Sequence, residues 1–218
     1  MRIIHVFALV LVASTACTGN KPPALPPVKV DAAAANALVP AALKAKFVFA
    51  ERTETRDALD LKSNKETFTF AAPTSWKRDD MSMIVNLAAP ESDGFGMFTG
   101  LVLNSNCDGG CEPKDWKAVS DRVELHQILI REDLKIEKDE VGNADHLVVA
   151  TGNGTTYIVY SWWAVGGSRY YACRAVLDTV DAAAPDPRGA TDTVDAAAPD
   201  PHGATDALVA ACKAVRVD

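Results

Sequence analysis

Long apolar runs are missing from this chain of 218 residues. A transmembrane helix needs about 20 consecutive apolar residues. The best candidate, Ile3 to Ala13, is only eleven residues long and is interrupted by His5. We therefore expect no membrane-spanning helix.

Basic residues are scarce relative to acidic ones. The chain has 22 Lys and Arg residues against 29 Asp and Glu, for a formal net charge of −7. A nucleic-acid-binding protein needs a basic patch to contact the phosphates. No segment has the cluster of basic residues that binds an anionic membrane surface by itself. We expect no nucleic-acid partner and no polybasic membrane anchor.

Recognisable catalytic motifs are also absent. The sequence has no HExxH zinc helix, no GxSxG nucleophile elbow and no Walker loop. Two histidines, His126 and His146, fall in predicted elements but lie twenty residues apart. The adjacent acids Asp139 and Glu140 fit a solvated face better than a hydrolase dyad. We expect no catalytic residues, no metal ligands and no cofactor.

The N-terminus has the pattern of an export signal. Met1 and Arg2 form a short positive region before the apolar run, and small residues follow at 14–16. This order is typical of a secretory signal peptide, which we assign to residues 1–16.

A cysteine follows the small residues directly. The quartet Ser14-Thr15-Ala16-Cys17 resembles the lipobox of bacterial lipoproteins. The resemblance implies that Cys17 receives a diacylglyceryl group and becomes the mature N-terminus. Ala16 matches the family, whereas Ser14 stands where the family usually has Leu. Small residues at these two places also suit ordinary signal-peptidase cleavage, so a secreted protein is the alternative.

Residues 17–42 are rich in proline and alanine, and we predict that they form a tether. Prolines at this density disfavour helix and sheet. The tether would hold a single domain, residues 43–218, away from a bilayer. The lipoprotein resemblance implies a cell-envelope location, with the membrane contacted through the lipid and an envelope protein as candidate partner. Thr18 after the cysteine indicates the outer membrane, on its periplasmic or surface face, if the cell is Gram-negative.

Four further cysteines are expected to form disulfides, because exported proteins fold in an oxidising compartment. Glycines in the loop Cys107-Asp108-Gly109-Gly110-Cys111 permit a tight reversal. We therefore predict the pairs Cys107–Cys111 and Cys173–Cys212. The alternatives are a redox dithiol or a metal site. A thioredoxin-type motif has two residues between its cysteines rather than three, and no further Cys or His follows closely enough for zinc.

The pattern of apolar residues predicts mainly β-structure. It indicates strands at 44–53, 66–72, 81–88, 95–104, 134–141, 146–151, 155–165 and 169–177. Helices are predicted from Pro113 to about residue 130 and over 207–215. Asn153-Gly154 is a strong hairpin signal. We expect an α+β fold: a mainly antiparallel sheet of about six to eight strands with helices packed on it.

One short signature accompanies this element order. The residues Phe68-x-Phe70-x-x-Pro73-x-x-Trp76 form a strand that ends in Pro and Trp. With the order of elements over residues 47–215, this resembles the PsbP-like α/β/α family. The resemblance implies an α/β/α sandwich and, because that family's roles are diverse and mostly non-catalytic, little about function.

The sequence contains a tandem duplication. Residues 178–191 and 192–205 differ only in having Arg188 or His202 at one position. A unit of fourteen residues is too short for a solenoid repeat, and its aspartates lack the spacing of a calcium loop. We predict a flexible loop over 178–205.

Aromatic residues are the remaining candidate binding groups. Trp76, Trp162 and Trp163 could grip a ligand or partner if they were exposed. Trp162 and Trp163 are adjacent in a strand and must point to opposite faces, so packing in the core is the alternative. Together these features predict a lipid-anchored, non-catalytic envelope protein that serves as a binding or accessory module. The alternative is a redox or hydrolytic enzyme that uses Cys107 and Cys111.

Overall fold

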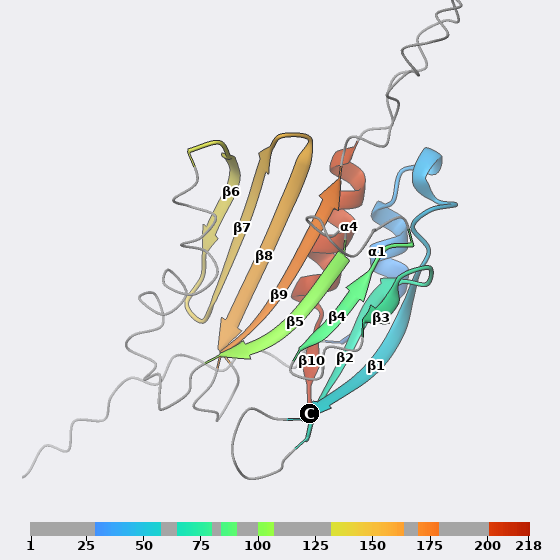
Figure 1. The fold of residues 1–218 in the computed structure, drawn as a ribbon, viewed down its shortest axis with the longest axis vertical. Helices are drawn as coiled ribbons and strands as arrows, with labels where there is room; N and C mark the ends of the chain where they lie inside the picture. Colours follow the sequence, from blue (N-terminus) through green and yellow to red (C-terminus); the bar gives the residue numbers. More distant parts are fainter. Residues whose placement is uncertain are drawn as a thin grey trace, which may run out of the picture.

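The computed structural model describes residues 29–57, 65–79, 84–90, 100–106, 132–163, 170–178 and 201–218. Within these ranges, ten strands form two sheets in which every pairing is antiparallel (Figure 1). The predicted helix from Pro113 to residue 130 and the loop between Cys107 and Cys111 lie outside the described residues.

The larger sheet has seven strands in the order β3-β4-β5-β9-β8-β7-β6. Their bounds are β3 (Lys77–Asp79), β4 (Val85–Ala88), β5 (Gly100–Asn106), β6 (Lys135–Val141), β7 (Asp145–Gly152), β8 (Thr155–Trp163) and β9 (Tyr170–Asp178). Every residue of β8 is buried, because this strand lies inside the sheet and both of its faces are covered. Asn153 and Gly154 form the β7–β8 turn with positive φ angles of 52° and 74°, as the hairpin signal predicted.

The smaller sheet has the order β1-β2-β10, with β1 (Phe49–Asp57), β2 (Lys65–Pro73) and β10 (Arg216–Val217). Most of β2 is buried, whereas β1 alternates between exposed and partly buried residues. The Asn36 side chain closes the outer edge of β1 where the strand begins. Its Nδ2 donates to the Phe49 carbonyl and its Oδ1 accepts from the Phe49 N–H, both at 2.8 Å.

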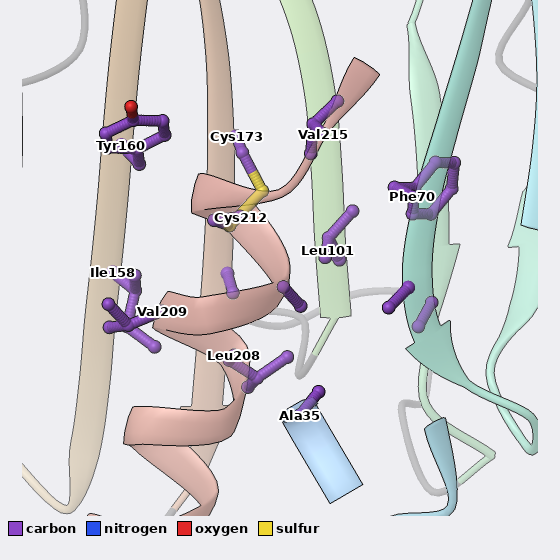
Figure 2. Packing of buried hydrophobic residues seen from close by; sticks show 14 of the residues in the cluster. Ala35, Phe70, Leu101, Ile158, Tyr160, Cys173, Leu208, Val209, Cys212 and Val215 are labelled. Atoms are coloured by element: carbon purple, nitrogen blue, oxygen red, sulfur yellow. A yellow bond between two sulfur atoms is a disulfide. The ribbon is translucent and has the colours of Figure 1, made fainter. Parts of the chain in front are cut away.

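Two α-helices, α1 (Ala32–Leu38) and α4 (Pro201–Lys213), and the 3₁₀ helix η1 (Ala41–Leu43) complete the described structure. Figure 1 shows α1 and α4 side by side behind the strands, and the two helices are in contact. The main core lies between α4 and the sheets. Leu208 and Val209 of the helix belong to the same buried cluster as Leu101, Ile158 and Phe70 of the strands (Figure 2).

The antiparallel sheet expected from the sequence is therefore present. The description as helices packed on a sheet fits only loosely, because the described residues are predominantly β-structure with two short α-helices. Neither of these helices is long and apolar enough to cross a membrane.

The folded region begins before residue 43, inside the range assigned to the tether. Val30, Ala35 and Val39 are 8%, 1% and 3% exposed and belong to the main core. The carboxylate of Asp31 accepts a hydrogen bond from the Ala34 N–H at 3.0 Å and so caps α1. Since α1 is too short to be stable alone, its packing on α4 and the sheet stabilises it.

The second helix also begins earlier than predicted. The sequence indicated a helix over 207–215 and a flexible loop over 178–205, but α4 starts at Pro201. The last five residues of the second repeat copy are therefore helical, and Ala204 and Thr205 are only 3% and 5% exposed. Proline suits the first turn of a helix, where its missing N–H breaks no hydrogen bond.

Candidate functional site

The predicted disulfide between Cys173 and Cys212 is present. It joins β9 to α4 with an S–S distance of 2.02 Å and a Cα–Cα distance of 5.4 Å (Figure 2). Both side chains are fully buried, so this bond is a structural cross-link. Cys17, Cys107 and Cys111 lie outside the described residues, and lipidation and the second disulfide stay predictions.

The three candidate binding tryptophans lie in the interior. Trp76, Trp162 and Trp163 are 3%, 8% and 6% exposed. Trp76 packs edge-on against Phe47, with 6.3 Å between the ring centroids. The buried positions agree with core packing, the alternative considered from the sequence.

Trp162 is the centre of an aromatic stack. Its ring stacks on Tyr160 of the same strand and on Tyr171 of β9, at centroid distances of 5.5 and 5.8 Å. The Tyr160 hydroxyl donates to Asp145 Oδ2 at 2.9 Å. Burial raises the pKa of Tyr160 above its ordinary value, and the charge and hydrogen bond of Asp145 raise it further. The phenol therefore stays protonated and acts as a hydrogen-bond donor.

An Asp–His pair lies on the opposite face of the larger sheet. His146 Nε2 is 2.6 Å from Asp139 Oδ1, and Ser161 stands directly opposite His146 in the strand register. These residue types can support nucleophilic catalysis, but a substrate must reach them. His146 and Ser161 are only 2% and 1% exposed, so the described structure gives no access.

The adjacent acids of β6 point to different partners. Asp139 pairs with His146, whereas Glu140 Oε2 lies 3.1 Å from Lys213 Nζ on α4. A glycosidase dyad needs two carboxyl groups that face one substrate. Asp139 and Glu140 therefore do not form such a dyad. Among the described residues, no group of three or more His, Cys, Asp or Glu side chains could hold a metal ion.

A cleft of about 540 Å³ opens between β6, the β7–β8 hairpin and the first half of α4. Its volume lies in the range of small-molecule sites, roughly 300–1,000 Å³. The lining is rich in hydroxyl groups and includes backbone near the hairpin turn. It comprises Glu137, Lys138, Val149, Thr151, Gly152, Gly154, Thr155, Thr156, Thr205 and Asp206.

A β-bulge shapes the polar side of this cleft. The β6–β7 register shifts between Ile136 and Lys138, so Glu137 is the extra residue. A bulge breaks the alternation of a strand, and here two consecutive side chains, Glu137 and Lys138, both line the cleft. Thr151 Oγ1 donates to Glu137 Oε1 at 3.0 Å.

An exposed ion pair links the two walls of the cleft. Lys138 Nζ on β6 lies 3.1 Å from Asp206 Oδ1 on α4. With one cation and two carboxylates among its lining residues, the cleft has no strong positive potential for an anion. Threonine hydroxyls can both donate and accept hydrogen bonds, which suits a neutral ligand with hydroxyl or amide groups.

The sequence analysis did not find this cleft. The signals available were the threonines at 151, 155 and 156 around a hairpin turn, which predict only a strand and its turn. On the other wall, Thr205 is the last residue of the repeat copy that was predicted to be a loop, and Asp206 follows it. Comparison of the chain with protein-family models and with curated protein sequences found no match.

Proposed function

We propose that this protein is a lipid-anchored, non-catalytic module of the cell envelope that binds a small polar ligand in the cleft between α4 and β6–β8. The observation that carries the proposal is the cleft itself, with its volume of about 540 Å³ and its threonine-rich lining. Small neutral ligands are recognised by a few fixed hydroxyl and backbone groups in a concave site of this size.

Two further observations support the location. The buried Cys173–Cys212 bond suits an oxidising, exported compartment. The lipobox-like residues that end at Cys17 would supply the membrane anchor. The resemblance to the PsbP-like family, whose roles are mostly non-catalytic, fits an accessory module.

The anchor is tested by the intact mass of the protein from its native membrane fraction, with and without reduction. We expect a diacylglyceryl mass on Cys17 and a gain of about 4 Da on reduction, since each disulfide takes up two hydrogens. A lipid-free mass would favour the secreted alternative. Labelling of Cys107 or Cys111 by a thiol reagent without reductant would favour the envelope enzyme.

The cleft is tested by nuclear magnetic resonance titration with N-acetylated sugars and short neutral peptides. We expect shift changes at the amides of the cleft lining. Thr151→Phe fills the cleft and should weaken that binding at least tenfold. Thr55→Phe, on the exposed face of β1 outside the cleft, is the matched control and should bind as the parent does. Equal loss in both variants, or no binding by the parent, would contradict the assignment.

A further inference from the structure

Opposite charges meet inside the cleft, one from each wall. Lys138 lies on β6 and Asp206 on α4, and both residues line the cleft. Their side chains form an ion pair, with 3.1 Å between Lys138 Nζ and Asp206 Oδ1. The two side chains are 42% and 52% exposed, so water and small solutes reach both. A ligand in the cleft can therefore contact a cation and an anion that lie next to each other.

This ion pair can be exchanged for contacts to a ligand at little cost. An exposed ion pair contributes little to stability, because water weakens the attraction and ordering the side chains costs entropy. Strand β6 also has a second link to α4, since Glu140 Oε2 lies 3.1 Å from Lys213 Nζ. Glu140 and Lys213 are not among the residues that line the cleft. Opening the first pair therefore leaves β6 attached to α4 through the second.

The third charged group of the lining is already neutralised. The Glu137 carboxylate lies 3.0 Å from Lys135 Nζ and also accepts a hydrogen bond from Thr151 Oγ1 at 3.0 Å. The charges that a ligand meets are therefore one lysine ammonium and one aspartate carboxylate, and these balance. A ligand with only a negative charge would take Lys138 from Asp206 and leave that carboxylate without its cation. A ligand with only a positive charge would do the reverse.

A zwitterion avoids this penalty. Its carboxylate can bind the Lys138 ammonium while its own ammonium binds the Asp206 carboxylate, so each charge of the pair gains a new partner as it loses the old one. Between its two ends, a short peptide offers a backbone donor and acceptor, and threonine hydroxyls can bind both. The cleft lining contains four threonines, from the β7–β8 hairpin and α4: Thr151, Thr155, Thr156 and Thr205.

We propose that the cleft binds short zwitterionic peptides, with the free carboxylate on Lys138 and the free amino end on Asp206. The inference rests on the proposed function, because it names the class of ligand for the same cleft. The ion pair would then determine the specificity for unblocked ends. The threonine hydroxyls would hold the peptide group that lies between them.

The test compares four forms of the dipeptide alanyl-alanine in a nuclear magnetic resonance titration of the protein. One form has both ends free. Two forms have one end blocked, either by an acetyl group on the amino end or by an amide on the carboxyl end, and the last form has both ends blocked. We expect the form with two free ends to bind at least about tenfold more tightly than either singly blocked form, because each block removes a hydrogen bond between charged groups.

Two substitutions test which end each residue binds. Lys138→Met should abolish the preference for a free carboxyl end, and Asp206→Asn should abolish the preference for a free amino end. The readout is the ratio of two dissociation constants for one variant, and a general loss of stability does not change that ratio. Glu140→Gln with Lys213→Met is the matched control, since it removes the other ion pair between β6 and α4 and should keep both preferences.

The failure of this inference can be distinguished from the failure of the proposed function. Equal binding of all four peptides, or binding of N-acetylated sugars without any peptide, would overturn the inference and leave the cleft as a site for uncharged ligands. Loss of both preferences in the control variant would also overturn it, because the position of β6 rather than the two charges would then set the specificity. Binding of no peptide and no sugar would contradict the inference and the proposed function together.

Discussion

Arg56 shows what a single buried charge contributes to this fold. Its side chain is fully buried, and its Nε donates to Glu66 Oε2 at 2.9 Å. Its guanidinium lies 5.3 Å from the centre of the Phe68 ring, and the Tyr171 hydroxyl donates to the other Glu66 oxygen at 3.3 Å. The network joins β1 and β2 to β9, and removing one member breaks its contacts with the others.

We expect Arg56→Ala to lower the free energy of unfolding by about 3–5 kcal/mol, because it leaves the Glu66 carboxylate buried without its cation. Urea denaturation measures this change. Lys135→Ala is the matched control, since it breaks an ion pair with Glu137 whose lysine side chain is 77% exposed. Such pairs contribute about 0–1 kcal/mol. Equal losses in the two variants would contradict the role given to Arg56.

The buried Tyr160 predicts that the free energy of unfolding depends on pH. Because its pKa is raised in the folded protein, the neutral phenol is favoured by folding. Its contribution is complete below the unfolded pKa of about 10 and is lost as the pH rises above it. We expect Tyr160→Phe to cost about 1 kcal/mol at pH 7, through loss of the hydrogen bond to Asp145.

The stability of the parent relative to Tyr160→Phe should fall by about 1.4 kcal/mol per pH unit above 10, so that the difference of about 1 kcal/mol at pH 7 reverses its sign by about pH 11. Denaturation curves of both proteins at pH 7, 10 and 11 measure it, and their difference cancels the titration of other groups. A difference that stayed constant across this range would show that Tyr160 ionises equally easily in the folded and unfolded chains.

The elements differ in how far the sequence could define them. Strands β2 and β7 agree with their predicted ranges to within one residue at each end, because Pro73 ends the first strand and the turn signals Gly142-Asn143 and Asn153-Gly154 flank the second. Helix α1 was missed, since Ala35 is its only buried residue and the sequence therefore shows no apolar stripe there. The start of α4 could not be found, because the same motif occurs in both repeat copies and no local signal in the second copy marks the beginning of a helix.

The repeat gives a prediction at the scale of an element. Deleting residues 192–205 would place residues 187–191, Pro-Arg-Gly-Ala-Thr, directly before Asp206. The start of α4 would then differ only by Arg in place of His202. Since shortening a loop changes its closure entropy by only about 0.6 kcal/mol per halving, we expect the melting temperature to stay nearly constant.

Thermal unfolding measures this outcome. Deleting residues 195–208 is the matched control, because it removes the same length but takes Ala207 and Leu208 out of the core. That control should be strongly destabilised. A drop of more than about 8 °C on deleting residues 192–205 corresponds to roughly 2 kcal/mol for a domain of this size. Such a drop would show that the first repeat copy cannot replace the second at the start of α4.

The candidate cleft could not be predicted from the sequence. It depends on the bulge at Glu137 and on where the first half of α4 lies against β6. Neither is encoded by a local motif. The Cys173–Cys212 disulfide could be predicted from the sequence, because the signal-like N-terminus predicts an oxidising compartment and the close spacing of Cys107 and Cys111 favoured pairing the other two cysteines.

For the whole molecule, the Cys173–Cys212 bond is the long-range link between the sheet and the C-terminal helix. Its partners lie 39 residues apart in sequence. Replacing both by Ala should cost about 4 kcal/mol by the chain-entropy estimate, measured by urea denaturation. Replacing Cys107 and Cys111 by Ser should cost about 2 kcal/mol, since their predicted loop is much shorter. A smaller loss for the first pair than for the second would contradict this order.

The outer edge strands of the two sheets determine whether neighbouring copies of the protein, anchored in one membrane, could pair their sheets. A lipid anchor would confine the protein to two dimensions, where neighbouring copies meet far more often than in solution. Open strand edges then invite edge-to-edge pairing and aggregation. Strand β6 carries a bulge and five charged residues among its seven, and Asn36 occupies the hydrogen-bonding groups where β1 begins. On an anchored protein, the same bulge that shapes the cleft would therefore also oppose sheet pairing between neighbouring copies.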